Sequence, residues 1–242
     1  MYEPRTYRHS IKNNDLISFN IVVEETDLYI SASSNLQREA YKLVSKYRDI
    51  LKRYIEQHPS FLTSLEPVPV GDDAPCIIKS MSEAAGKVGV GPMASVAGAI
   101  AEFVGRELLT FSPEIIVENG GDIYLKSLRN RLVGIYAGKS SLSGKIGLEI
   151  DGQDTPLGIC TSSGTVGHSL SFGKADAVIV LSKSATLADA AATAIGNLIV
   201  KSGDIPRGIE FAMGIEELKA VVIIKDDDMG LWGKVKIRQT SV

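Results

Sequence analysis

The segment Ser184–Val200 constrains the fold more than any other part of this chain, because it is long, apolar and almost free of charge. Asp189 is the only charged residue between Lys183 and Lys201. A helix that faces solvent normally carries several charges, so the pattern predicts a helix buried on most sides. Its polar residues fall within a stripe about 80° wide on a helical wheel, and they are Thr186, Asp189, Thr193 and Asn197. This stripe must face other polar groups.

The rest of the chain predicts strands in runs and helices in groups, which is typical of an α+β fold with a largely antiparallel sheet. Alternation and turn residues predict strands at Arg5–Ile11, Leu16–Glu24, Asp27–Ala32, Ile115–Glu118, Asp122–Lys126, Arg131–Tyr136, Lys145–Ile150, Gly158–Thr161, Ala175–Leu181, Leu218–Lys225 and Gly233–Ile237. Helical spacing predicts further helices at Leu36–Ile55, Ile77–Ala85, Pro92–Leu109 and Pro206–Ala212. Strands on both sides of the helices must share one sheet to bury the apolar helix. We therefore expect one domain over residues 1–242, with the Pro67–Pro75 loop on its surface.

Composition narrows the classes of protein. The 242 residues carry a net charge of −3 and are 44% hydrophobic, which favours a globular protein without a nucleic-acid partner. Cys76 and Cys160 form no Cys-x-x-Cys pair, which argues against a disulfide framework and a zinc site. No apolar signal segment follows Met1, and Ser184–Val200 is short for a membrane span. The sequence thus predicts a cytoplasmic protein without a membrane partner and leaves the oligomeric state open.

Asp189 and Thr193 are candidate ligands of a metal ion. They lie four residues apart, so their side chains converge on one point of the helix surface. One carboxylate and one hydroxyl suit Mg²⁺, which often completes its shell with waters and substrate phosphates. The alternative is a buried aspartate that is hydrogen-bonded to a neighbouring loop.

A glycine-rich run precedes the helix predicted at Pro92–Leu109. It contains Gly-x-Gly-x-x-Ala, but the segment before it has a helical pattern, whereas a dinucleotide-binding fingerprint follows a strand. What remains is a helix N-terminus whose free amides favour an anion, with Gly89 and Gly91 as candidate binding residues. The alternative is a tight connector between two closely packed helices.

Asn119-Gly120-Gly121-Asp122 lies between two predicted strands. Asn-Gly is a hairpin-turn signal, and a pair of glycines also lets a ligand approach the backbone closely. The four residues are therefore either a plain turn or part of a binding site.

The segment Thr161–His168 is dense in hydroxyls and glycines. Thr161, Ser162, Ser163 and Gly164 offer donors that can surround a phosphate. His168 is a candidate general acid or base. The alternative is a polar surface loop in which the histidine has no role, and Cys160 before it fits a small strand residue better than a nucleophile.

Taken in order, these segments resemble the motifs of the ApbE-like superfamily, best known for FAD:protein FMN transferases. The matching residues are Gly120-Gly121-Asp122, Thr161-Ser162-Ser163-Gly164, His168 and Asp189-Ala190-Ala191-Ala192-Thr193. The similarity covers roughly Gly86–Asn197 and points to a compact branch of the superfamily. It implies the α+β T-fold architecture and a phosphate-bearing ligand, FAD or another flavin nucleotide. It also implies Mg²⁺ held by Asp189, Thr193 and a backbone carbonyl near the glycine-rich loop, with His168 assisting transfer of FMN to a protein acceptor.

Two classes of function stay open. Retention of Asp189, Thr193 and His168 favours a Mg²⁺-dependent flavin or nucleotide transferase, or a pyrophosphate hydrolase. The family carries a Lys and an Asp in the segment that matches Pro92–Ala97, and neither is present here. Their loss favours a non-catalytic ligand-binding or accessory protein, which the resemblance links to sulfur assimilation in anaerobes.

Overall fold

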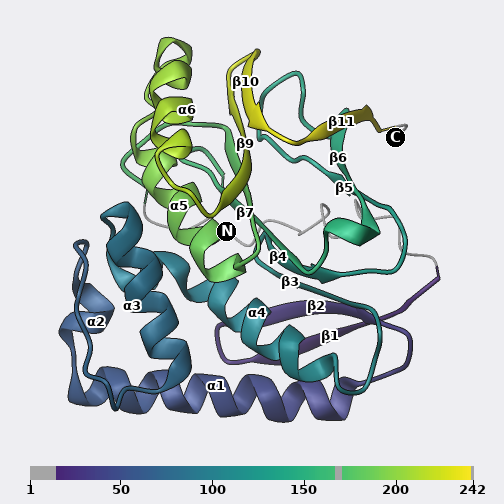
Figure 1. The fold of residues 1–242 in the computed structure, drawn as a ribbon, viewed down its shortest axis with the longest axis vertical. Helices are drawn as coiled ribbons and strands as arrows, with labels where there is room; N and C mark the ends of the chain where they lie inside the picture. Colours follow the sequence, from purple (N-terminus) through teal and green to yellow (C-terminus); the bar gives the residue numbers. More distant parts are fainter. Residues whose placement is uncertain (1–14, 167–170, 241–242) are drawn as a thin grey trace.

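The computed structural model describes residues 15–166 and 171–240, and it shows helices packed on one face of a large sheet (Figure 1). The sheet has eight strands in the order β1-β2-β3-β4-β7-β8-β9-β10, and all neighbours are antiparallel. The strands are β1 (Ile17–Val23), β2 (Thr26–Ala32), β3 (Ile115–Asn119), β4 (Asp122–Lys126), β7 (Leu157–Ser162), β8 (Ala177–Ser182), β9 (Leu218–Lys225) and β10 (Asp228–Gly233).

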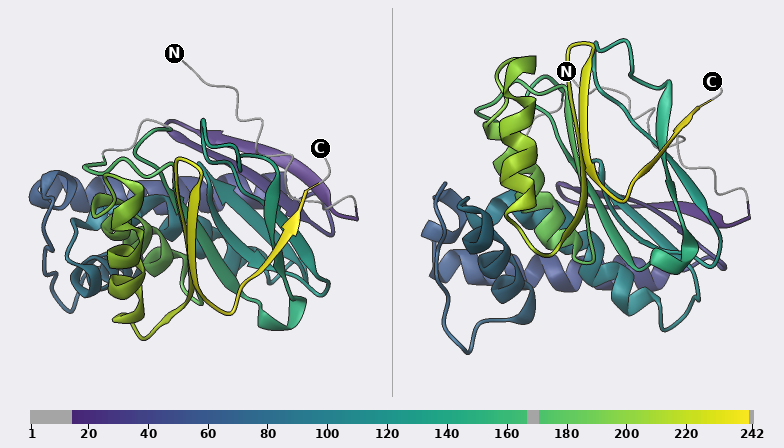
Figure 2. Two further views of the ribbon diagram at one scale, coloured as in Figure 1. Left: turned by 90° about the horizontal axis from the view of Figure 1, so that it is seen from above. Right: turned by 45° about the horizontal axis from the view of Figure 1, so that its top comes forward.

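The second face of this sheet is covered by a small sheet of three strands. Its order is β11-β6-β5, also antiparallel, with β5 (Arg131–Gly134), β6 (Ile146–Ile150) and β11 (Lys236–Gln239). Its apolar side chains, including Val133 and Leu148, share a core with Leu125 and Ile159 of the large sheet. Figure 2 shows this small sheet and the helices on opposite sides of the large one.

The helical layer is built around the apolar segment that the sequence singles out. The helices are α1 (Gln37–Gln57), α2 (Ser60–Thr63), α3 (Cys76–Val88), α4 (Val96–Leu108), α5 (Ala185–Asn197) and α6 (Ile205–Met213). Every residue of α5 from Ala185 to Ala192 is buried. Its alanines let α5 lie close to β7 and β8 on one side and to α3 and α4 on the other. The predicted burial of this helix is therefore confirmed.

The α+β class with an antiparallel sheet is confirmed, and most of the predicted elements are present. The strand predicted at Gly233–Ile237 is wrong, because Gly233 ends β10 with φ +90° and Lys236 begins β11. The sequence pattern predicts neither β10 nor the short helix α2. The helix predicted from Pro92 begins with a 3-10 turn, Pro92–Ser95, before α4. The strand predicted at Arg5–Ile11 lies outside the described residues.

Within the described residues, no single helix is long and apolar enough to cross a membrane. Only the pair Cys76–Val88 and Pro92–Leu108 passes such a test together, and it is bent by 104°.

A buried ion-pair network ties the first described residues to the sheet. Arg131, only 4% exposed, donates to both carboxylate oxygens of Asp15 and lies 3.0 Å from Glu114 Oε2. Glu114 in turn accepts from the Ser127 hydroxyl at 2.6 Å. Both carboxylates keep the arginine neutralised where water does not reach it.

Candidate functional site

The β3–β4 hairpin brings two polar side chains to the helical face of the large sheet. Asn119 pairs directly with Asp122, and the two-residue loop between them needs positive φ at Gly120 (+68°) and Gly121 (+106°). Side chains alternate along a strand, and Val117 and Tyr124 belong to the core under the helices. Asn119 and Asp122 therefore point toward the helices too. The segment Asn119–Asp122 is therefore a hairpin turn, as one alternative predicted, and the same turn presents two candidate site residues to the helices.

Strand β7 lies beside β4 and contributes its own polar residues. The Thr161 amide donates to Asp122 Oδ1 at 3.1 Å. Cys160 is fully buried on the helical face, and its thiol donates to the Ala185 carbonyl of α5 at 3.3 Å. Ser162 shares that face by alternation, and a Cβ on Gly196 of α5 would lie 3.5 Å from the Ser162 hydroxyl. The Thr161 side chain points to the opposite face.

The N-terminus of α4 meets Asp189 of α5. Gly98 N donates to Asp189 Oδ2 at 2.9 Å, and the Asn119 side-chain amide donates to the Ala97 carbonyl at 3.1 Å. The contact depends on glycine, because a Cβ at Gly98 would lie 2.4 Å from the Ala185 carbonyl and 2.8 Å from Asp189 Cβ. Free amides at a helix N-terminus stabilise a carboxylate, so Asp189 holds this end of α4 in place.

A second acid makes the reverse contact from α4 to α5. Glu102 Oε2 accepts from the Thr186 amide and hydroxyl, both at 3.0 Å, and from the Ser184 hydroxyl at 2.9 Å. Arg106 lies 3.0 Å from the other oxygen of Glu102. Each helix thus supplies the carboxylate that caps the N-terminal turn of its neighbour, which fixes the position of Asp189.

Burial and like charge set the electrostatics of this cluster. Burial raises the pKa of Asp189 to about 7, although hydrogen bonds from the amides of Gly98 and Ala97 oppose the shift. Burial, followed by the charge of Asp189, raises the pKa of Asp122 well above its ordinary value. Burial and both carboxylates also raise the pKa of the Cys160 thiol. The thiol therefore has no activated, thiolate character.

The residues at the two ends of the predicted polar stripe of α5 make structural hydrogen bonds, whereas Thr193 near its centre does not within the described residues. Thr186 bonds Glu102, and Asn197 accepts from the Phe172 amide at 2.9 Å. Thr193 is half-buried, and its hydroxyl has no hydrogen-bond partner among residues 15–166 and 171–240. Asp189 and Thr193 lie one turn apart on α5, and Asp189 is within electrostatic reach of Asp122.

This donor set fits Mg²⁺ better than a softer metal. It consists of carboxylate and hydroxyl oxygens, which are the ligands of hard cations. In the described part of the chain, no three His, Cys, Asp or Glu side chains gather in a way that could hold a metal ion alone. A Mg²⁺ ion here would need waters or phosphate oxygens to complete its shell.

The serine-rich loop after β7 is largely bonded to itself. Ser163 Oγ accepts from the amides of Thr165 at 3.2 Å and Val166 at 3.0 Å. The Gly164 amide donates to the Ala175 carbonyl at 2.9 Å. Among the predicted phosphate ligands of this loop, Ser162 is the one whose side chain faces α5. His168 lies outside the described residues.

The two glycines predicted to bind an anion occupy positions required by the fold. Gly89 ends α3 in the left-handed conformation, with φ +74°. A Cβ at Gly91 would lie 1.9 Å from the Ser64 carbonyl. Because the 3-10 turn Pro92–Ser95 follows, neither glycine forms the N-terminus of α4.

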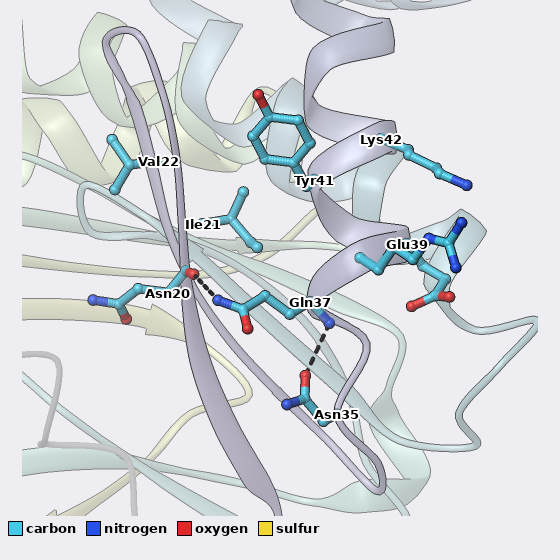
Figure 3. A pocket seen from close by; sticks show the side chains of 9 residues that line it. Asn20, Ile21, Val22, Asn35, Gln37, Glu39, Tyr41 and Lys42 are labelled. Atoms are coloured by element: carbon cyan, nitrogen blue, oxygen red, sulfur yellow. Dashed lines mark hydrogen bonds between the residues drawn. The ribbon is translucent and has the colours of Figure 1, made fainter.

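Two hollows of the described surface lie elsewhere. One is an open groove between β1 and the start of α1, where Ile21 and Tyr41 face each other and Gln37 donates to the Asn20 carbonyl at 3.5 Å (Figure 3). The other lies over α3, the start of α5 and the segment before β9, with Lys87 and Glu217 at its rim. Neither is lined by a residue predicted to bind metal, phosphate or flavin.

Sequence reasoning missed the contribution of α4. The amide of Gly98, the carbonyl of Ala97 and the carboxylate of Glu102 all position the site. The available signal was Glu102, a single acid in an otherwise apolar stretch from Val96 to Val104. An isolated acid of this kind is typically paired or capping when buried.

Comparisons with known proteins identify the family of this chain. A family model described as AbpE bacteria matches residues 8–217. A UPF0280 protein from Methanopyrus kandleri is 46% identical over 228 residues, covering 90% of this chain and 91% of the relative. Another from Methanocaldococcus jannaschii is 42% identical over 221 residues, covering 89% and 90%.

Solved structures share the fold. The flavin transferase ApbE from Vibrio cholerae aligns with a TM-score of 0.53 at 14% identity, covering 90% of this chain and 96% of that one. The apo flavinyl transferase ApbE from Pseudomonas stutzeri aligns with a TM-score of 0.57 at 12% identity, covering 90% and 93%. Identities this low establish the shared architecture alone.

Proposed function

Because this chain belongs to the AbpE bacteria family of ApbE-like proteins, we propose that it binds a flavin nucleotide, FAD, together with Mg²⁺ at the site between β4, α4 and α5. The observation that carries this proposal is Asp189. Its carboxylate is buried and fixed by the Gly98 amide, and it lies one turn from the Thr193 hydroxyl, which has no partner in the described part of the chain. A flavin transferase in the same fold supports flavin as the ligand.

We further propose that the bound FAD is cleaved at its pyrophosphate. The acceptor hydroxyl of a protein threonine attacks the phosphorus on the FMN side, a P–O bond forms there, and the bridging P–O bond breaks. AMP leaves with the electron pair, and the hydroxyl proton passes to His168 or to AMP. Bound Mg²⁺ would neutralise charge on the phosphates.

The chain's own residues have separate roles in this scheme. Asp189 and Thr193 would hold the cation, while the Thr161–Gly164 segment and the Gly120-Gly121 turn would lie along the phosphates. His168 would accept the proton as a general base. Cys160 has no role as a nucleophile, because its burial keeps the thiol protonated.

The first test is a thermal-unfolding series with FAD, FMN, ADP and AMP, each with and without Mg²⁺. A ligand at about 100 times its dissociation constant adds about 2.7 kcal/mol of stability. We expect the largest shift with FAD and Mg²⁺ together, and no shift in Asp189→Ala. Glu114→Gln is the matched control, since Glu114 is also buried but bonds the Ser127 hydroxyl at 2.6 Å and Arg131 at 3.0 Å, away from this site. A wild-type protein that FAD and Mg²⁺ do not stabilise would contradict the proposal.

The second candidate is a ligand-binding protein without transfer chemistry. The family's Lys and Asp are absent from Pro92–Ala97, which folds as the 3-10 turn and the start of α4. Chromatography of FAD incubations separates the candidates, because the enzyme releases AMP and the binding protein returns intact FAD.

A further inference from the structure

Asp122 and Asp189 belong to two different elements and lie within electrostatic reach of each other. Asp122 stands at the first position of β4, directly opposite Asn119, whose amide donates to the Ala97 carbonyl at 3.1 Å. Asp189 of α5 accepts from the amide of Gly98, the next residue of α4, at 2.9 Å. Asp122 and Asp189 are 6% and 9% exposed. Cys160, which packs against α5, is within electrostatic reach of both carboxylates. Two buried acids of separate elements thus lie close to the same strand residue.

No basic side chain in the described part of the chain neutralises this pair. The ion pairs of the described lysines and arginines all involve other acids, such as Glu102, Glu107 and Asp176. The next acid, Glu118, adds further negative charge to the surroundings of Asp122. Buried carboxylates normally have a cationic partner, so the charge of this pair calls for one.

Both carboxylates keep free acceptor capacity. An ionised carboxylate has about four lone-pair positions. Asp122 accepts from the Thr161 amide at 3.1 Å, and Asp189 accepts from the Gly98 amide at 2.9 Å and from the Ala97 amide. The amides orient the two groups, and within residues 15–166 and 171–240 each carboxylate keeps lone pairs that a ligand can use.

We propose that Asp122 is a second protein carboxylate at the cation site, so that the chain binds one divalent cation through Asp122 and Asp189 before any nucleotide arrives. This inference rests on the proposed function for the location of the site, but it requires no flavin. Two carboxylates are within the usual protein contribution to a Mg²⁺ site. The cation would then link β4 to α5, and the phosphates of the nucleotide would bind to an ion already in place.

The test uses Mn²⁺ as the probe and electron paramagnetic resonance as the readout, with the full chain and no nucleotide. Wild type is expected to remove one equivalent of free Mn²⁺ from solution. Asp122→Asn should raise the dissociation constant about tenfold or more, because one of the two charges facing the ion is lost. Asparagine keeps an oxygen for the Thr161 amide, so the fold should persist. Asp176→Asn should bind like wild type, since Asp176 already lies 3.6 Å from Lys225.

A second measurement avoids substitution altogether. In wild type labelled with ¹³C-aspartate, a Mg²⁺ titration should move two side-chain carboxyl signals together. A single moving signal, or Mn²⁺ affinity unchanged in a folded Asp122→Asn, would overturn the inference, as would no binding by wild type at millimolar Mn²⁺.

Failure of this inference is distinguishable from failure of the proposed function. Mn²⁺ binding that requires Asp122, without stabilisation by FAD, would keep the inference and remove the flavin proposal. FAD and Mg²⁺ binding that is unchanged by Asp122→Asn would keep the flavin proposal and remove the inference about Asp122.

Discussion

The buried carboxylate of Asp189 makes the stability of the cation-free protein depend on pH in an unusual direction. Its pKa rises from 3.8 to about 7 on folding, so between these values the folded chain holds a proton that the unfolded chain has released. Because the folded state binds more protons, the free energy of unfolding must fall as pH rises through this window. Above pH 7 both states are ionised at this group, and its contribution becomes constant.

The magnitude follows from the same shift. One pKa unit corresponds to about 1.4 kcal/mol, so a shift from 3.8 to about 7 gives up to about 4 kcal/mol lost across the window. Asp189→Asn removes the titrating group and keeps an oxygen for the Gly98 amide. We therefore expect the variant to be more stable than wild type at pH 8, by an amount that shrinks toward zero near pH 4.

The assay is urea unfolding of both proteins at pH 4 to 9 with a chelator present. The difference between variant and wild type at each pH cancels groups distant from Asp189, such as Asp15, whose pKa the Arg131 hydrogen bond lowers. Asp122 adds to the difference in the same direction, because the charge of Asp189 raises the Asp122 pKa. Added Mg²⁺ should raise wild-type stability at pH 8 and leave Asp189→Asn unchanged. A difference that stays constant from pH 5 to 8 would refute the reasoning, because Asp189 would then titrate as an ordinary exposed acid.

Four further outcomes are expected. Arg131→Met should lower the free energy of unfolding by roughly 3 kcal/mol in urea titrations, because it leaves two carboxylates without their buried partner; full stability would contradict this. Gly121→Ala should cost about 1–2 kcal/mol in thermal unfolding because of its positive φ, whereas Gly86→Ala inside α3, where a Cβ meets nothing within 4 Å, should gain about 0.5–1 kcal/mol. His168→Ala should bind FAD normally but slow AMP release by about 10²–10⁴-fold, and an unchanged rate would remove this histidine from the mechanism. Limited proteolysis at Pro67–Pro75 should not give two separately stable halves if the chain is one domain.

The fold was predictable where local pattern and tertiary environment agree. Alternating apolar residues specified most strands, and the near absence of charge specified the burial of α5. The pattern failed at β10, where Asp228–Gly233 is exposed at a sheet edge and carries two glycines. Edge strands lack the two-sided burial that produces a clear apolar signal.

The site was predictable only in part, because capping contacts between helices leave little trace in sequence. Their spacing on one helix predicts Asp189 and Thr193 as candidate ligands. The role of Gly98 depends on the approach of α5, which brings the Ala185 carbonyl to 2.4 Å from where a Cβ would be. Such a contact joins residues far apart in the chain, and no local pattern encodes it.

Asp189 serves both the fold and the proposed ligand, and this shared role determines how variants must be interpreted. Its carboxylate caps α4 through Gly98, while Glu102 caps α5 in return. Loss of the Asp189 side chain therefore weakens the α4–α5 contact as well as any cation site. Thr193 makes no such contact within the described residues, so Thr193→Ala removes a candidate ligand without disturbing the helices. A cation affinity that falls in both variants, with stability altered in Asp189→Ala alone, is the pattern that a true binding site requires.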